Sequence, residues 1–324
     1  MYYIGVDLGG TNIAIGLVNE DLKIVDKGSV PTKADRDAEL IIKDMAELTA
    51  HILQRNQLTV DDVAYVGIAS PGIANSDDGV IEYANNLPFL HFPVVKVFQK
   101  YLPIKTIYVE NDANAAAVGE AIAGSAKGAK NSLMITLGTG VGGGILINGK
   151  VYSGFNHAGA ELGHMIIVKD GKLCSCGRRG CFEAYCSATA LIKQTEEKIT
   201  ECKIKSIPTL LNDEVAANNG RVSARTAFNA QKRGDPVAIE LVNQYISYLA
   251  CGITNLINIF QPSILSIGGG VSGEKNNLLN PLISLISREQ YSRDLEHHLQ
   301  TKIVIATLGN DAGIIGAACL GMQD

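Results

Sequence analysis

Hydrophobic and polar positions alternate over the first third of the chain in the way that strands, turns and amphipathic helices do. The β-branched runs YYIGVDL, IAIGLVN and KIVDKGSV, separated by the polar turns GGTN and NEDL, predict three strands. Apolar residues then recur at intervals of three and four between about Arg36 and Asn56, which predicts a long amphipathic helix. The order βββαβαβα is completed by a strand VAYVGIA, a helix around Val94–Tyr101, a strand TIYVE and a helix DANAAAVGEAIAG.

The same pattern restarts in the middle of the chain. The segment MITLGTGVGGGILIN repeats GVDLGGTNIAIGLVN, so that Leu8 aligns with Leu137. Self-similarity of this kind indicates duplication of one α/β lobe, and 324 residues are enough for two lobes. The expected small lobe comprises residues 1–111 and 311–324, because the closing helix DAGIIGAACLG is expected to pack back on it. The expected large lobe comprises residues 112–310.

The amino-acid composition excludes some classes of protein function. Hydrophobic residues make up 46% of the chain and charged residues 19%, with a net charge of −5, which is typical of a globular protein without a basic nucleic-acid or membrane-binding patch. The N-terminus MYYIGVDLGG lacks the regions of a signal peptide, and the longest apolar stretches are broken by glycines or polar residues. Seven cysteines, an odd number concentrated in one cluster, favour a reducing cytosol. The sequence therefore predicts a cytoplasmic protein with no nucleic-acid or membrane partner.

Two glycine-rich turns, DLGGTN and LGTGVGG, occupy equivalent places in the two halves. The chain has no G-x-x-x-x-G-K-[ST] motif, which excludes a P-loop nucleotidase. GTGVGG fits the dinucleotide pattern G-x-G-x-x-G, but a β-hairpin follows it where a dinucleotide fold needs a helix. A lone Gly-Gly-Thr would be an ordinary tight turn, whereas the duplicated pair favours close approach of backbone N–H groups to a phosphate. Asp7 could hold Mg²⁺ through water, and Gly269 in the cluster SIGGGVSG suits contact with a nucleotide base or ribose.

Three carboxylates are candidates for catalysis or sugar binding. Asp112 ends a strand and opens an Ala-rich helix, so it is either a helix N-cap or a general base. Asn111 beside it can both donate to and accept from a sugar hydroxyl. Glu161 and Glu183 flank the cysteine cluster, and each is either a solvent-facing charge or a planar acceptor for a sugar.

The segment of residues 164–183 combines one imidazole with three thiols. Three thiolates and one imidazole form a tetrahedral zinc set, and four protein ligands leave no open position for a reacting water. The predicted metal is therefore structural, and a redox pair is disfavoured because the motif is C-x-C rather than C-x-x-C. Arg178 and Arg179 either keep the thiolates ionised or belong to a solvated turn. The predicted ligands are His164, Cys174, Cys176 and Cys181.

Together these motifs resemble one family over essentially the whole chain. The segments DLGGTN, SPG, ENDANAAA, LGTGVGGG, GAELGH and CSCGRRGCFEAY are similar to those of the ROK family (repressors, open reading frames and sugar kinases), to which the pattern C-x-C-G-x-x-G-C-x-E is specific. The resemblance implies the actin-like (ribonuclease H-like) ATPase fold with two duplicated lobes. The chain is most similar to the bacterial glucokinases of the family, which implies phosphorylation of glucose to glucose 6-phosphate with ATP and Mg²⁺. Membership also implies a homodimer or higher homo-oligomer.

The resemblance implies roles for individual residues. Asp112 is similar to the family's catalytic base, which deprotonates the sugar 6-hydroxyl for attack on the γ-phosphate of ATP. The positions that match sugar contacts are Gly72, Asn111, Asp112, Glu161, His164 and Glu183, and the sugar loop EYANNLPFL adds Asn86. The positions that match the phosphate loops are Gly9, Gly10, Thr11, Asn12, Thr139 and Gly140. The four zinc ligands match as well, so the structural Zn²⁺ is implied to orient the sugar site.

Other functions stay open from the residues alone. A kinase for mannose, fructose or N-acetylmannosamine would share these motifs, although an N-acetylated sugar needs space for its acetamide group. A non-catalytic ROK sugar sensor or repressor would carry a helix-turn-helix before the core, for which DLGG, starting at residue 7, leaves no room. A glycosidase built on Asp112, Glu161 and Glu183 would leave both glycine turns unexplained. We therefore expect a sugar kinase.

Overall fold

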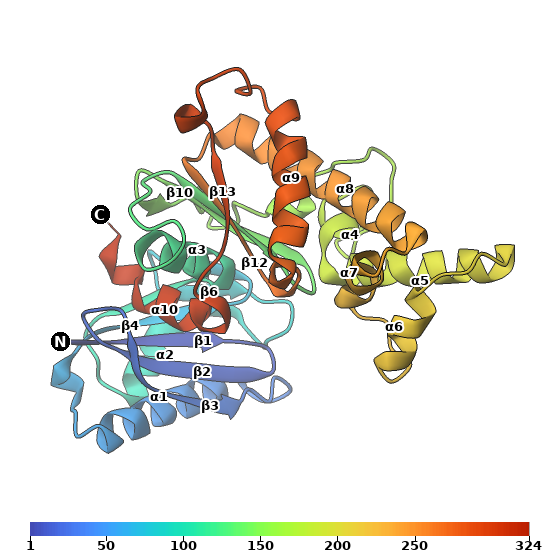
Figure 1. Cartoon of the computed structure of the whole chain (residues 1–324). Helices are drawn as coiled ribbons and strands as arrows, with labels where there is room; N and C mark the ends of the chain where they lie inside the picture. The colour runs from blue at the N-terminus through green and yellow to red at the C-terminus, as the bar shows by residue number, and fades with distance from the viewer. Residues whose placement is uncertain (324) are drawn as a thin grey trace. The chain divides into compact units, whose positions relative to one another are not determined.

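The computed structural model describes residues 1–323 and forms two compact units, whose elements are labelled in Figure 1. The helix that begins at Asp112 belongs to unit 1. From the sequence, this helix was expected in the second lobe, which was to begin at residue 112. Unit 1 comprises Met1–Met134, Gly144–Ala160 and the described residues from Ala306 onward, and unit 2 comprises Ile135–Gly143 and Glu161–Ile305.

Unit 1 is built on a five-stranded sheet with the order β3-β2-β1-β4-β8. Its strands are β1 (Tyr2–Leu8), β2 (Asn12–Val18), β3 (Ile24–Pro31), β4 (Val63–Ser70) and β8 (Ile107–Asn111). β1, β2 and β3 form an antiparallel meander, whereas β1, β4 and β8 are parallel, with Asp7 opposite Ala69 and Ser70 opposite Asn111. Because parallel strands end at the same edge of a sheet, the segments that follow β1, β4 and β8 share one edge.

Helices cover both faces of this sheet. They are α1 (Ala38–Arg55), α2 (Val94–Tyr101), α3 (Asp112–Ile122) and α10 (Ala312–Ala318). The β1 residues Ile4, Val6 and Leu8 are fully buried in the core that α1 and α2 complete. Gly5 points to the opposite face, where a Cβ would lie 1.9 Å from the carbonyl oxygen of Ile314 in α10. The alternation of large and absent side chains lets α10 touch the sheet backbone.

A small second sheet in unit 1 was not predicted from the sequence. It has the order β5-β6-β7 and consists of β5 (Ile73–Asn75), β6 (Val80–Tyr83) and β7 (Leu90–Phe92). Strands this short do not display a recognisable period-two pattern. The predicted sugar loop connects β6 to β7, so this sheet supports it.

The other five-stranded sheet has the order β11-β10-β9-β12-β13, which matches the first sheet strand for strand. Its strands are β9 (Ser132–Leu137), β10 (Val141–Ile147), β11 (Lys150–Val151), β12 (Ile264–Gly268) and β13 (Lys302–Ile305). The hairpin of β9 and β10 corresponds to that of β1 and β2, and β12 pairs with β13 in parallel, as β4 does with β8. The duplication predicted from the sequence is therefore confirmed.

Helices make up most of unit 2 (Figure 1). They are α4 (Glu183–Cys186), α5 (Ala188–Lys205), α6 (Leu211–Ala217), α7 (Ala224–Lys232), α8 (Pro236–Phe260) and α9 (Asn276–Glu289). Short 3-10 turns over the chain are η1 (Val60–Asp62), η2 (Leu162–His164), η3 (Gly270–Glu274), η4 (His297–Leu299), η5 (Gly309–Asp311) and η6 (Leu320–Met322). Asp235 is the N-cap of α8, and its carboxylate accepts from the backbone N–H groups of Val237 and Ala238 in the helix; Pro236 occupies the first helical position. Within the described residues, no helix has the length and apolar character that crossing a bilayer requires.

A buried carboxylate fixes the start of the C-terminal segment of unit 1. Glu120 in α3 is 1% exposed. Its carboxylate accepts from the backbone N–H groups of Thr307 at 2.9 Å and Leu308 at 2.8 Å. It also accepts from the N–H of Ser125 at 2.6 Å and from the Ser125 hydroxyl at 2.7 Å. These donors compensate for the loss of solvent around the carboxylate, because hydrogen bonds to a charged group are stronger than those between neutral groups.

Replacing Glu120 with glutamine should lower the free energy of unfolding by about 2–4 kcal/mol, because an amide NH₂ would face N–H donors that then lose their acceptor. Urea unfolding followed by circular dichroism measures the effect. The matched control is Glu47→Gln in α1, an exposed glutamate that pairs with Lys43 at 3.7 Å. Equal unfolding midpoints for the two variants would contradict this role of Glu120.

Candidate active site and metal centre

The first glycine-rich turn joins β1 to β2 and is held by Thr32. The N–H of Gly9 donates to the carbonyl of Asn12 at 2.9 Å and closes the turn. The hydroxyl of Thr32 donates to the carbonyl of Gly9 at 2.6 Å, and the N–H of Thr32 donates to the carbonyl of Thr11 at 2.8 Å. Thr32 is fully buried, so it fixes the turn from the protein side. Sequence reasoning missed this residue, since its partners lie about twenty residues away.

Asp7 precedes this turn in a confined position. Burial raises the pKa of its carboxyl group above the ordinary value. A Cβ at Gly313 of α10 would lie 2.5 Å from the Asp7 carboxylate, so only glycine leaves room for the side chain. A cation held near Asp7 would offset the cost of burying its charge, which fits the predicted Mg²⁺ position.

Residues predicted to bind sugar lie along the shared edge of the unit 1 sheet. A Cβ at Gly10 would lie 2.6 Å from Nδ2 of Asn86, so the sugar loop contacts the first phosphate turn. The side-chain N–H of Asn111 donates to the carbonyl of Gly72 at 3.0 Å. Gly72 has φ +90°, and a Cβ there would lie 2.0 Å from the carbonyl oxygen of Tyr83. The structure therefore brings Gly72, Asn86 and Asn111 together with the first turn.

Asp112 is the first residue of α3 and is exposed. The N-cap of the helix is Asn111, whose side-chain oxygen accepts from the N–H groups of Ala113 at 2.9 Å and Asn114 at 3.2 Å. An oxygen of Asp112 accepts from Ala113 at 2.8 Å. The alternative that Asp112 serves as the N-cap is therefore wrong, because the preceding residue has that position.

Glu110 is a buried residue beside Asp112 that sequence reasoning did not select. Its carboxylate accepts from the N–H of Asn111 at 2.8 Å and from the side-chain amide of Asn114 at 3.0 Å. Burial raises the pKa of this carboxyl group. Its two bonds hold the backbone and the first turn of α3, so Glu110 positions the segment that carries Asp112.

The second glycine-rich turn joins β9 to β10 in unit 2. The N–H of Gly138 donates to Gly140 at 3.0 Å, and the N–H of Ala188, at the start of α5, donates to Gly138 at 2.8 Å. Gly269 has φ +80°, and a Cβ there would lie 2.5 Å from the backbone of Leu137. The third glycine cluster thus adjoins the second turn, as its predicted contact with a nucleotide requires.

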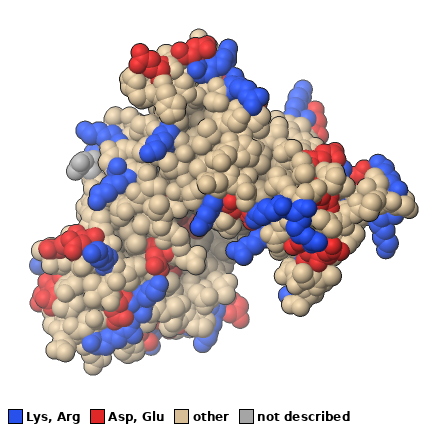
Figure 2. Space-filling view, viewed as in Figure 1, with Lys and Arg blue, Asp and Glu red and all other residues tan. Residues whose placement is uncertain are grey.

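A pocket of about 610 Å³ lies beside the second turn within unit 2. Its lining includes Thr139 and Gly140 of the turn and two lysines, Lys172 and Lys193. Lys172 pairs with Glu197 at 3.0 Å, so its charge is partly balanced. Figure 2 likewise shows basic and acidic side chains intermingled on the face in view. An anion in this pocket would be met mainly by backbone dipoles rather than by one basic field.

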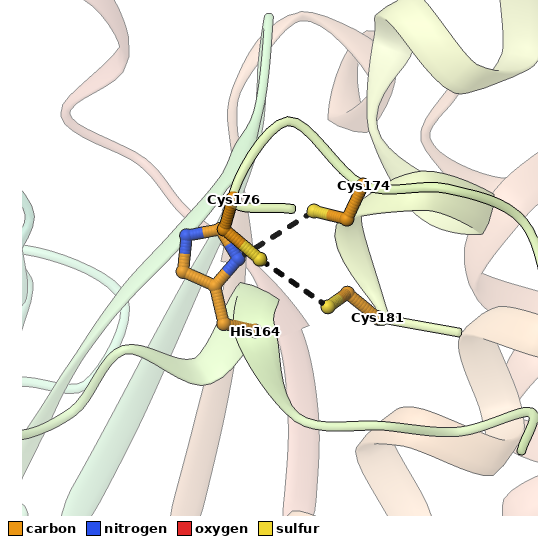
Figure 3. Close-up of side chains that lie close together, drawn as sticks. All are labelled: His164, Cys174, Cys176 and Cys181. Carbon is orange, nitrogen blue, oxygen red and sulfur yellow. Dashed lines mark hydrogen bonds between the residues drawn. The ribbon is translucent and has the colours of Figure 1, made fainter. Parts of the chain in front are cut away.

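The four predicted metal ligands converge in unit 2, as Figure 3 shows. Their ligand atoms lie within 4.8 Å of one another. The sulfurs of Cys176 and Cys181 are 3.7 Å apart, and Nδ1 of His164 is 3.7 Å from the sulfur of Cys174. Two thiolates on a tetrahedral zinc, with Zn–S bonds of about 2.3 Å, lie about 3.8 Å apart. The spacing and the donor types therefore fit a four-coordinate metal.

The loop that carries these ligands is anchored on the core of unit 2. Phe182, next to Cys181, is fully buried against α8, where a Cβ at Gly252 would lie 2.3 Å from its ring. The backbone N–H of Arg178 lowers the pKa of the Cys176 thiol, and the positive charge of Arg178 adds to this effect. Burial raises the pKa of Cys181 to about 12, so a metal ion is needed to keep that sulfur ionised.

The remaining predicted sugar residues lie around this loop. Glu161 is exposed and immediately precedes η2, which ends at His164. One oxygen of Glu183 accepts from the N–H of Val141 at 3.0 Å, next to the second turn. The other oxygen accepts from the hydroxyl of Ser175 at 2.9 Å. Sequence reasoning expected Glu183 to contact a sugar, and it did not anticipate the bonds to Val141 and Ser175.

These features define a class of protein. The structure contains two five-stranded sheets of the same strand order, and in each a glycine-rich turn joins the first two strands along the chain. This duplicated arrangement is the actin-like ATPase fold.

Comparisons with known proteins identify the family. The model described as "ROK family" matches residues 3–324. A glucokinase from Halalkalibacterium halodurans is 36% identical over 323 residues, which cover 99% of this chain and 95% of that protein. An N-acetyl-D-glucosamine kinase from Vibrio cholerae is 30% identical over 337 residues, 100% of both chains. The crystal structure of a ROK family glucokinase from Streptomyces griseus, in complex with glucose and AMPPNP, matches with a TM-score of 0.80 and 31% identity over 100% of both chains. The chain belongs to the ROK family.

The four converging ligands predict that the purified protein contains metal. Protein purified without chelator should contain about one equivalent of metal per chain, and Cys176→Ser should reduce this to a small fraction, since a hydroxyl is a poor ligand for a soft site. Elemental analysis by mass spectrometry measures the content. Cys251→Ser, which changes a cysteine of α8 outside the cluster, should retain the metal. Equal metal content in both variants would contradict the assignment.

Proposed function

We propose that this ROK-family sugar kinase of the hexokinase type transfers the γ-phosphoryl group of ATP to the 6-hydroxyl of glucose. The observation that carries the proposal is the position of Asp112. It is exposed at the start of α3, on the sheet edge that also carries the first phosphate turn and Gly72. Full-length similarity to proteins named glucokinase, one of them solved with glucose and AMPPNP, supports the choice of sugar and phosphoryl donor.

In this proposal Asp112 is the general base. Its carboxylate accepts the proton of the 6-hydroxyl while that oxygen forms a bond to the γ-phosphorus and the bond to the β–γ bridging oxygen breaks, which releases ADP. Asn111 keeps the start of α3 in place through its cap bonds and holds Gly72, and Nδ2 carries a second hydrogen that can donate to a sugar hydroxyl. The exposed position of Asp112 gives a substrate hydroxyl access to the carboxylate.

Both glycine-rich turns match phosphate-loop positions of the family. Gly9, Gly10, Thr11 and Asn12 of the first turn would present backbone N–H groups and a hydroxyl to a phosphate. Thr139 and Gly140 of the second turn would present the same kinds of donor. Mg²⁺ bound with ATP supplies positive charge to the phosphates, and Asp7 would hold it through water. Gly269 would approach the base or ribose.

The metal at His164, Cys174, Cys176 and Cys181 is proposed to be Zn²⁺ in a structural role. Three thiols and one imidazole suit zinc, and four protein ligands leave no position for a reacting water. Its proposed effect is to order the loop that carries Glu183 and to fix the position of His164, so that both face the sugar along with Glu161.

A second candidate is phosphorylation of an N-acetylhexosamine. The full-length similarity to a protein named N-acetyl-D-glucosamine kinase favours it, at a lower identity than the similarity to glucokinases. Mannose, fructose and N-acetylmannosamine are further substrates that the same catalytic residues would serve.

Asp112→Asn should lower kcat for glucose phosphorylation by about 10²–10⁴-fold, because the amide cannot accept the hydroxyl proton. The variant keeps a side-chain oxygen that can accept from Ala113, so its melting temperature should change little. Formation of glucose 6-phosphate in a coupled assay measures the rate.

The control is Asp61→Ala, which changes an exposed acidic residue in the first turn of η1 and should leave the rate unchanged. Retention of most of the wild-type activity by Asp112→Asn would show that another group is the base.

A further inference from the structure

The carboxylate of Glu183 links the second phosphate turn to the metal loop, which is the segment of residues 164–181 that carries the four predicted metal ligands. One oxygen, Oε2, accepts from the backbone N–H of Val141 at 3.0 Å, at the end of the turn. The other oxygen, Oε1, accepts from the hydroxyl of Ser175 at 2.9 Å. Ser175 lies between two metal ligands, Cys174 and Cys176, so the metal loop determines where its hydroxyl lies. One side chain therefore contacts both elements.

The turn leaves little freedom for this carboxylate. A Cβ at Gly140 would lie 2.3 Å from Oε2 of Glu183, so the carboxylate in this position occupies space that a side chain at residue 140 would need. Thr139, Gly140, Ser175 and Glu183 all line the same pocket of about 610 Å³. The link therefore lies at the wall of the pocket where phosphates would bind.

The two ends of the turn are held in different ways. Gly138, at its start, accepts from the N–H of Ala188 at 2.8 Å, a backbone bond that does not involve the metal loop. Val141, at its end, donates to Glu183. Hydrogen bonds to a carboxylate are stronger than bonds between neutral groups. The shape of the turn at Thr139 and Gly140 therefore depends on where the metal loop places Glu183.

Ser175 is the donor that persists when metal is bound. The thiol of Cys174 also lies 3.8 Å from Oε1 of Glu183. A cysteine bound to a metal is a thiolate and has no hydrogen to donate. The hydroxyl of Ser175 then provides the hydrogen bond from the metal loop to Oε1.

We propose that Ser175 and Glu183 are positioning residues through which the ordered metal loop sets the nucleotide-binding shape of the second phosphate turn. The loop thus acts on the phosphoryl donor as well as on the sugar. This inference rests on the proposed use of ATP, but it concerns nucleotide binding and does not depend on which sugar is phosphorylated.

A double-mutant cycle tests the link. Binding of AMPPNP with Mg²⁺, in the absence of sugar, is measured by titration calorimetry for the wild type, Ser175→Ala, Glu183→Ala and the double variant. Ser175→Ala should weaken binding by about three- to tenfold in the wild-type background, the effect of one hydrogen bond to a charged group. In the Glu183→Ala background the same change should alter binding by less than about twofold, because Ser175 acts through Glu183.

Further measurements separate positioning from loss of metal or fold. Ser175→Thr keeps the hydroxyl and should bind AMPPNP like the wild type. Metal content, measured for every variant, should be unchanged by Ser175→Ala. In turnover assays Ser175→Ala should raise KM for ATP while kcat at saturating ATP stays within about twofold. Ser287→Ala, an exposed serine of α9, is the matched control and should change neither quantity.

Three results would overturn the inference. The first is wild-type affinity of Ser175→Ala for AMPPNP, and the second is an equal loss of affinity from Ser175→Ala in the wild-type and Glu183→Ala backgrounds. The third is a loss of affinity in Ser175→Thr as large as in Ser175→Ala. A different result would contradict the proposed function: a wild-type protein that binds AMPPNP but phosphorylates no sugar. Absence of AMPPNP binding by the wild type would remove both proposals.

Discussion

A turn that binds phosphate must expose its backbone N–H groups and still keep one shape. The contacts around both glycine-rich turns of this protein can be understood from that constraint. Glycine removes the side chains that would block an anion, but it also removes conformational restraint. Unit 1 restores the restraint with the buried Thr32, which bonds two carbonyl groups of the first turn. Unit 2 restores it with the start of α5 and the carboxylate of Glu183. Each turn therefore obtains its rigidity from residues distant in sequence.

The chain contains two five-stranded sheets of the same strand order, and different elements accompany each of them. Unit 1 adds the three short strands β5, β6 and β7, which support the loop of Asn86 against the first turn. Unit 2 adds the metal loop, whose four converging ligands fit a closed coordination sphere. A closed sphere would give a bound metal a structural role. The bonds of Glu183 connect the loop of these ligands to the second glycine-rich turn. The two glycine-rich turns thus have separate supports.

What the sequence predicted well was local. The glycine turns, the spacing of the metal ligands and the strand–turn–strand repeat are all contained in short segments, and the structure has them where they were expected. Residues whose role depends on long-range contacts escaped prediction. Thr32 and Glu120 each act on a partner that no periodicity or motif connects to them. The position of α3 in unit 1 also depends on a long-range contact, because α3 packs against α10, which lies far from it in the sequence.

We propose that these elements serve phosphoryl transfer from ATP to glucose. The most direct test is a comparison of kcat/KM for the wild-type protein, with ATP and Mg²⁺, on glucose, mannose, fructose, N-acetylglucosamine and N-acetylmannosamine. We expect the highest kcat/KM for glucose, about tenfold or more above that for the N-acetylated sugars. A substituent for which the site has no space lowers kcat/KM by at least that factor. A higher value for an N-acetylated sugar, or no turnover of any of the five, would contradict it.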